Sequence, residues 1–172
     1  MPGDAACGPA MPTFHQLFVA LAFLAALGSG LIAGVFFAFS SFVMKALSRR
    51  PADQGLAAMQ AINIAVINPL FLGVFLGTAL LCIAVTAVAF SRWWAPGAAY
   101  AVAGAALYLL GSFVVTMLCN VPLNNALAKL TASDPAAAEQ WSHYVRRWTA
   151  WNHVRTVTAL AAAALLSIAM RH

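Results

Sequence analysis

The stretch QLFVALAFLAALGSGLIAGVFFAFSSFVM, residues 16–44, contains no Lys, Arg, Asp or Glu. A transmembrane helix needs about 20 predominantly apolar residues to cross the hydrocarbon core, so this stretch is long enough to span a membrane. Three more apolar stretches follow, at residues 64–90, 97–119 and 151–170. The sequence therefore predicts an all-α membrane protein, built as an antiparallel bundle of four spanning helices.

The composition supports this assignment, because 63% of the residues are hydrophobic, only 8% are charged and the mean hydropathy is +0.87. A soluble domain carries roughly a quarter charged residues. Most of the 172 residues belong to the predicted spans, which leaves no room for a separate soluble module. We expect residues 1–13 to be a disordered extension, with either Met1 or Met11 as the start, and residues 14–172 to form one domain.

Charge and cysteine usage exclude two classes of function. The net charge of +5 comes from basic residues scattered at the ends of the spans, with no basic run that would indicate a nucleic-acid partner. The three cysteines, Cys7, Cys82 and Cys119, form no C-x-x-C pair, which argues against a thiol–disulfide exchanger. The N-terminus also lacks the basic region of a cleavable signal peptide, so we expect the first span to be retained.

The distribution of Lys and Arg predicts the orientation in the membrane. Cytoplasmic loops carry an excess of these residues. The side with the two long connections has Lys45, Arg49, Arg50, Lys129, Arg146, Arg147 and Arg155, and the opposite side has Arg92 and Arg171. We therefore expect both long connections in the cytoplasm and both termini outside, in a bacterial inner membrane.

Two shorter helices are predicted between the spans. Asp134-Pro135 is a typical helix start, and Trp141, Tyr144, Trp148 and Trp151 then recur at spacings of three and four residues. This pattern predicts an additional helix along the membrane surface between spans three and four, leading into span four.

The other short helix lies between spans one and two, where Pro51 opens a helix that runs to Asn63, and Asn68-Pro69 interrupts the start of span two. Two G-x-x-x-G motifs, residues 30–34 and 73–77, predict close helix packing within the bundle.

Uncharged polar residues collect where span one ends, span two begins, span three ends and span four begins. In an antiparallel bundle all four of these positions lie at the same end. Buried amides must be satisfied by one another, by water or by a ligand, which favours a polar pocket there. For any single Asn a cap or turn, and for any single Trp an interfacial position, is an equally good interpretation. The predicted substrate-binding residues are Ser40, Asn63, Asn68, Asn120, Asn124, Asn125, Trp148 and Trp151.

The start of span four carries the residues predicted to be catalytic. Ionisable groups within a membrane are costly and mark functional sites. A neutral imidazole at His153 can accept a proton, while Arg155 and Asn152 can stabilise the resulting anion. No Asp or Glu lies inside a predicted span, so a di-iron carboxylate site is excluded. We expect no metal, with a haem or copper held by His143 and His153 as the weaker alternative.

Four motifs in order resemble the anthrone oxygenase-like family of small four-helix integral membrane proteins. They are residues 34–40 (GVFFAFS), residues 59–63 (MQAIN) with Asn68-Pro69-Leu70-Phe71, residues 120–125 (NVPLNN), and Trp148-x-x-Trp151-Asn152-His153-x-Arg155-Thr156. Characterised fungal members oxidise anthrones to anthraquinones with molecular oxygen, without a bound flavin or metal. The resemblance implies a site made of Asn63, Asn120, Asn124, Asn125, Trp148, Asn152, His153 and Arg155.

Two hypotheses follow. The first is a membrane oxygenase that acts on an anthrone-like or other aromatic polyketide, with molecular oxygen as co-substrate and no cofactor. The second is a non-catalytic membrane protein that binds a lipid, a quinone or a partner helix. A transporter is disfavoured because no intramembrane carboxylate is present to couple protons. The expected partners are the lipid bilayer, a hydrophobic aromatic molecule and, in a homo-oligomer, a second copy of the chain.

Overall fold

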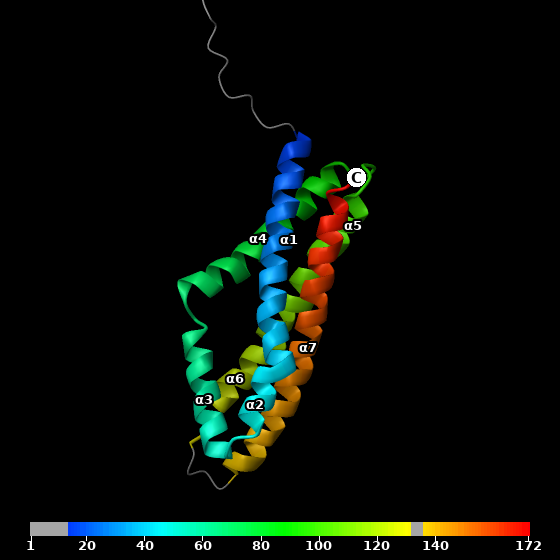
Figure 1. Ribbon diagram of the computed structural model, residues 1–172. Helices are drawn as coiled ribbons and strands as arrows, with labels where there is room; N and C mark the ends of the chain where they lie inside the picture. The colour runs from blue at the N-terminus through cyan, green and yellow to red at the C-terminus, as the bar shows by residue number, and fades with distance from the viewer. Residues whose placement is uncertain (1–13, 132–135) are drawn as a thin grey trace, which may run out of the picture.

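The computed structural model describes residues 14–131 and 136–172, which are almost entirely helical and contain no strand (Figure 1). Four helical segments within these ranges are long and apolar enough to cross a membrane: Phe14–Ser48, Pro69–Ser91, Ala98–Leu127 and Ala137–Ala169. The predicted all-α fold with four spanning helices is confirmed. The predictions for residues 1–13, including the choice between Met1 and Met11, and for the helix start at Asp134-Pro135 fall outside the described residues.

Two of the four spans are interrupted by π-helical stretches. In chain order the elements are α1 (Phe14–Ala38), a π-helical stretch (Phe39–Val43), α2 (Met44–Ser48), α3 (Ala52–Ala65), α4 (Pro69–Ser91), α5 (Ala98–Ala106), two π-helical stretches (Leu107–Val114 and Thr116–Asn120), α6 (Val121–Leu127) and α7 (Ala137–Ala169).

The first described turn of α1, the α4–α5 hairpin and the end of α7 lie at one end of the molecule (Figure 1). We call this the hairpin end. The short helices α2, α3 and α6 and the start of α7 form the other end, which we call the cap end. The first described residues of α1 and the end of α7 therefore lie on the same side, as predicted, and which side of the membrane this is stays a prediction.

The bundle has two separate hydrophobic cores. The larger one, the membrane core, joins α1, α4, α5 and α7 and consists mainly of small and aromatic side chains, among them Ala25, Phe75, Ala101, Tyr108 and Ala162. The second one, the cap core, consists of Met44, Leu56, Met59, Leu127, Trp141, Tyr144 and Trp148. The polar residues near Arg155 lie between these two cores, because α7 passes through both.

The helix α7 is longer than a membrane span needs to be, so its first part extends into the cap end and helps to form it. Its 33 residues span about 50 Å at 1.5 Å per residue, well beyond the ~30 Å of a hydrocarbon core. The helix predicted along the membrane surface is instead the first part of α7, continuous with span four. Trp141, Tyr144 and Trp148 are buried in the cap core, so the interfacial interpretation of Trp148 is wrong.

Two predicted span boundaries also shift. Residues 64 and 65 belong to α3, and span two begins at Pro69, because the Asn68 side chain caps α4 by accepting a hydrogen bond from the Phe71 amide at 3.0 Å. Span three does not stop at Cys119, since the helix continues through α6 to Leu127.

The predicted packing role of the G-x-x-x-G glycines is wrong. A Cβ added at Gly30, Gly34, Gly73 or Gly77 would meet no atom within 4 Å. The tight contacts are made by other glycines. Gly111 packs directly on the Thr158 side chain of α7, and a Cβ there would overlap it.

We expect Gly111→Ala to lower the thermal midpoint of the purified protein, because forcing an extra methyl into a packed interface costs about 1–3 kcal/mol. Gly30→Ala is the matched control. Ala is favoured over Gly in a helix by up to about 1 kcal/mol, so this variant should be at least as stable as the wild type. Equal destabilisation of both variants in detergent would contradict the packing described here.

Candidate functional site

The hydrogen-bonded polar residues at the boundary between the two cores come from the end of span one, the end of span three and α7. On α7, Trp148, Asn152 and Arg155 are spaced by four and three residues, so they share one buried face. We call the residues that meet this face the polar cluster. Its members are Ser40, Thr116, Asn120, Asn124, Tyr144, Trp148, Asn152, Arg155 and Thr156.

The π-helical stretches supply three of these side chains. Ser40 lies in the stretch 39–43, and Thr116 and Asn120 are the two ends of the stretch 116–120. π-Helical turns inside longer helices are rare and frequent at functional sites. Here they lie at the boundary between the membrane core and the cap core.

Asn152 links α7 to the end of α1. Its Nδ2 donates to the Phe36 carbonyl and to the Ser40 hydroxyl, both at 2.7 Å, and its Oδ1 accepts from the Arg155 guanidinium at 2.7 Å. The Ser40 hydroxyl also lies 3.1 Å from the Thr156 hydroxyl. The side chain is fully buried, and these contacts use all of the hydrogen-bonding groups of the amide.

Arg155 is the one charged residue among the buried side chains that the structure describes. Its side chain is 4% exposed. Besides Asn152, the guanidinium donates to the Thr116 hydroxyl at 3.2 Å. Its Cζ lies 4.2 Å from the centroid of the Phe36 ring and 5.0 Å from that of Trp148. Two aromatic faces and two neutral oxygens therefore surround the cation.

No carboxylate balances this charge within the described residues. Their two acidic side chains, Asp53 and Glu139, lie in the first turns of α3 and α7. Glu139 precedes Arg155 by 16 positions on the same helix, which corresponds to roughly 24 Å. A buried cation without an anionic partner carries a large desolvation cost. The site is therefore electrostatically prepared for an anion.

The cap side of the cluster is organised by Asn124. Its Oδ1 accepts two hydrogen bonds at 2.9 Å, one from the Tyr144 hydroxyl and one from the Trp148 indole nitrogen. Asn120 donates to the Trp148 carbonyl at 3.2 Å. Together Asn120 and Asn124 tie the end of span three to the aromatic face of α7.

Unpaired polar atoms accumulate at the same level. Among the buried side-chain atoms of the described residues, those without a hydrogen-bond partner include Arg155 Nε, Asn120 Oδ1, Asn63 Nδ2 and Thr149 Oγ1. Asn63 projects from α3 and lies beside the Tyr144 hydroxyl. Buried polar groups in native proteins are nearly always paired, so a group of orphans indicates that water or a ligand completes the site.

Several predicted site residues lie elsewhere. Asn68 is a helix cap whose Nδ2 also donates to the Ala65 carbonyl, so its cap interpretation is confirmed. Asn125 is exposed on the outer side of α6, and Trp151 is only half-buried and lies outside the cluster. Of the predicted substrate-binding residues, Ser40, Asn63, Asn120, Asn124 and Trp148 are brought together.

His153 is placed away from the polar cluster. Its side chain is exposed, whereas Asn152 and Arg155 on either side of it are buried. Two residues along an α-helix correspond to about 200°, so His153 and Arg155 face nearly opposite directions. The structure therefore separates the predicted base from the predicted anion-stabilising groups.

The alternative metal site at His143 and His153 is wrong, because both histidines lie on the continuous helix α7, about 15 Å apart along its axis. No group of three or more His, Cys, Asp or Glu side chains within residues 14–131 and 136–172 is placed to hold a metal ion. The expectation that no metal is bound stays a prediction.

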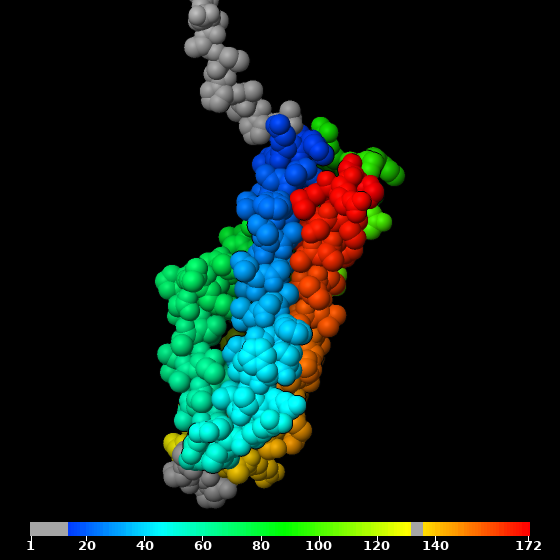
Figure 2. All heavy atoms as spheres, viewed as in Figure 1, coloured from blue at the N-terminus to red at the C-terminus, as the bar shows by residue number. Residues whose placement is uncertain are grey.

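Two openings lie close to the cluster. The surface is hollowed between α1 and the corner where α3 meets α4 (Figure 2). A cavity of about 230 Å³ lies between α6 and the start of α7. It is lined by apolar residues of the α6 side and by Glu139, Gln140, His143 and Tyr144 of α7. Tyr144 therefore borders both this cavity and the polar cluster.

Sequence reasoning missed Thr116 and Tyr144 as members of the site. Thr116 lies in an apolar run, where a threonine ordinarily donates to the carbonyl four residues before it, as it does here to Ser112 at 2.7 Å. Its second role, as acceptor of a hydrogen bond from Arg155, leaves no pattern in the neighbouring sequence. Tyr144 was visible only as part of the aromatic periodicity.

The fold and this site define a class of small integral membrane proteins, in which four spanning helices enclose a polar cluster at one end. The sequence model of the family described as anthrone oxygenase matches residues 68–165, more than half of the chain. The chain therefore belongs to the anthrone oxygenase family. No curated protein and no solved structure matched the chain.

We expect Asn124→Ala to lower the thermal midpoint of the protein markedly, because it leaves the Tyr144 hydroxyl and the Trp148 indole without an acceptor. Each buried donor left unpaired costs about 1–3 kcal/mol. The adjacent exposed Asn125→Ala provides the control and should change stability by no more than about 0.5 kcal/mol. Thermal unfolding in detergent compares the two, and a smaller effect at Asn124 than at Asn125 would refute this assignment.

Proposed function

We propose that this protein is a membrane oxygenase for a hydrophobic aromatic substrate of the anthrone type, and that the polar cluster holds the enolate formed from it. Family membership supports an oxygenase-like function. The observation that carries the assignment to this cluster is the buried Arg155, which has no carboxylate partner among the described residues and retains an unpaired Nε.

The main requirement of the proposed reaction is a group that binds and stabilises an anion. Transfer of a proton from the acidic CH₂ beside the aromatic rings to water gives an enolate, whose oxygen pairs with the Arg155 guanidinium. Charge-assisted hydrogen bonds of this kind are roughly twice as strong as neutral ones, and burial strengthens them further. Stabilisation of the enolate lowers the barrier to its formation.

Molecular oxygen is the co-substrate in this proposal. The enolate carbon passes electrons to dioxygen and forms a C–O bond, and the peroxide anion takes back a proton from the surrounding water. The resulting hydroperoxide then loses water to leave a carbonyl. One oxygen atom enters the product, the other leaves as water, and the CH₂ becomes C=O. The protein residues act by binding and charge stabilisation, and no cofactor is part of the proposal.

The apolar surroundings suit a substrate that dissolves in the bilayer. Ile64, Ile67 and Leu70, at the corner between α3 and α4, are 75%, 70% and 80% exposed and border the helix end next to the hollow in Figure 2. Phe36 and Trp148 flank the guanidinium and make its immediate surroundings aromatic.

A non-catalytic binding protein for a lipid or a quinone is the second candidate. The observation in its favour is the composition of the polar cluster, which contains neither a histidine nor a carboxylate to accept a proton. His153, predicted from the sequence to be the base, lies on the exposed side of α7. Under this alternative the anion would be the ligand itself.

Oxygen uptake with an anthrone separates these functions. We expect Arg155→Gln to lower the rate above autoxidation by about 10²-fold, since removal of one oxyanion donor costs about that much. His153→Ala should retain activity within a few-fold of wild type, because its side chain faces away from Arg155.

The wild type in the same membranes is the reference. Arg155→Lys keeps the positive charge but lacks the planar guanidinium with its paired donors, so it tests whether charge alone is sufficient for activity. Oxygen uptake by wild type equal to autoxidation would refute the oxygenase proposal and leave the binding protein. A loss of activity confined to His153→Ala would instead place the chemistry on the outer face of α7.

A further inference from the structure

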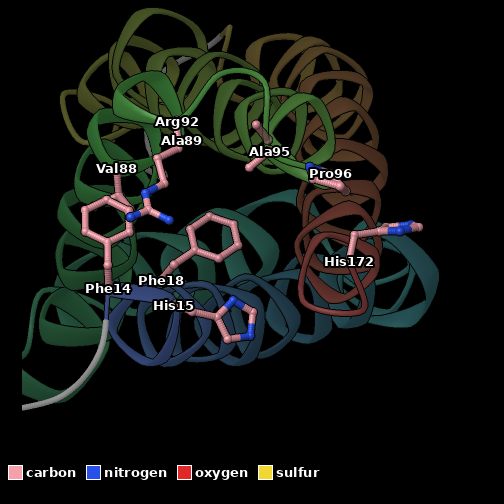
Figure 3. Close-up of a pocket in the computed structure, with 10 residues that line it drawn as sticks. Phe14, His15, Phe18, Val88, Ala89, Arg92, Ala95, Pro96 and His172 are labelled. Carbon is pink, nitrogen blue, oxygen red and sulfur yellow. The ribbon is translucent and has the colours of Figure 1, made fainter.

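A second cavity lies at the hairpin end of the bundle, opposite the polar cluster (Figure 3). It is bounded by the start of α1, the end of α4, the turn before α5 and the last residues of the chain. Its volume of about 90 Å³ is several times the ~10–15 Å³ that one water needs, and well below the ~300 Å³ of a drug-sized site. The cavity therefore fits a small compact group.

The cavity is lined by basic and aromatic side chains. Arg92 extends into the opening, with its Cζ 4.4 Å from the centroid of the Phe14 ring (Figure 3). His15 and His172 lie at the rim, and the His172 ring stacks on Tyr100 with a centroid distance of 5.8 Å. Contact with Phe14 fixes the position of the guanidinium and leaves its donor edge available.

No acidic side chain in the described ranges lines this cavity. Asp53 and Glu139 begin α3 and α7 at the cap end, whereas Arg171 adds a further positive charge next to His172. Helix ends of both signs meet at the cavity, since it is lined by Ala98 at the start of α5, by Ala89 near the end of α4 and by His172 after α7. The preference for an anion therefore rests on the Arg92 side chain.

The turn that closes the cavity also indicates its depth in the membrane. Trp93 and Trp94 are 45% and 95% exposed and follow Arg92 directly. Exposed tryptophans at the ends of spanning helices lie at the level of the lipid headgroups. Basic pockets between spanning helices on the cytoplasmic side bind phosphate headgroups, and a recess with the same kind of side chain at this end can hold the same anion.

We propose that the cavity at the hairpin end binds a single phosphate-type oxyanion, with Arg92 as its principal ligand and His15 at its rim. The anion is the phosphate of a lipid headgroup or free inorganic phosphate, since both present the same tetrahedral group. This site is independent of the polar cluster and of the proposed oxygenase reaction.

Two binding measurements on the full-length protein test this site. In the first, inorganic phosphate is titrated against detergent-purified protein, and the thermal midpoint is followed. In the second, the protein is placed in nanodiscs of phosphatidylglycerol or of phosphatidylcholine, and retained lipid is counted by native mass spectrometry. Arg92→Gln should weaken phosphate or phosphatidylglycerol binding at least tenfold, because charge-assisted hydrogen bonds to the anion are lost.

Arg171→Gln is the matched control, because it removes the same charge at the same end from a residue that does not line the cavity. Stabilisation by inorganic phosphate that is lost in Arg92→Gln alone identifies a free oxyanion. Selective retention of phosphatidylglycerol that is lost in Arg92→Gln alone identifies a headgroup. Equal binding by both variants, or no binding by wild type in either assay, overturns the proposal.

Discussion

The guanidinium of Arg155 lies inside the bundle and is held by neutral oxygens and aromatic rings instead of a carboxylate. Taking such a charge out of water is costly, so the groups around it must be placed accurately. Asn152 donates to α1 and accepts from Arg155, Thr116 of span three also accepts from Arg155, and Phe36 and Trp148 cover the flat faces of the guanidinium. The arrangement of α1, α7 and span three at this level therefore depends on one cation.

The Arg155 guanidinium lies at the boundary between the two hydrophobic cores. Toward the hairpin end, the small side chains of the membrane core let α1, α5 and α7 approach closely. Toward the cap end, the aromatic residues of the cap core hold α2, α3 and α6 against the start of α7. Between them the π-helical stretches supply Ser40, Thr116 and Asn120. We propose that the same region receives the substrate anion.

Much of the fold could be predicted from the sequence, because apolar length and the Asn68-Pro69 pair are local signals. The collection of Ser40, Asn63, Asn120, Asn124, Trp148, Asn152 and Arg155 at one end followed from antiparallel order alone. The orientation of His153 could not be predicted from the sequence. It depends on α7 being one continuous helix and on which face of α7 packs against α1. The prediction of a separate helix along the membrane surface was wrong for a related reason. The periodicity of the aromatic residues shows which face of a helix they share, but it does not show which element packs against that face.

The central claim is that the polar cluster stabilises a bound aromatic oxyanion through Arg155. The most direct measurement is the spectrophotometric titration of a hydroxylated anthraquinone bound to the protein, because its phenol and phenolate forms absorb at different wavelengths. The account predicts that binding to wild type lowers the pKa of the ligand relative to empty membranes, and that Arg155→Gln abolishes the shift. The same ligand pKa with wild type and with Arg155→Gln would contradict it.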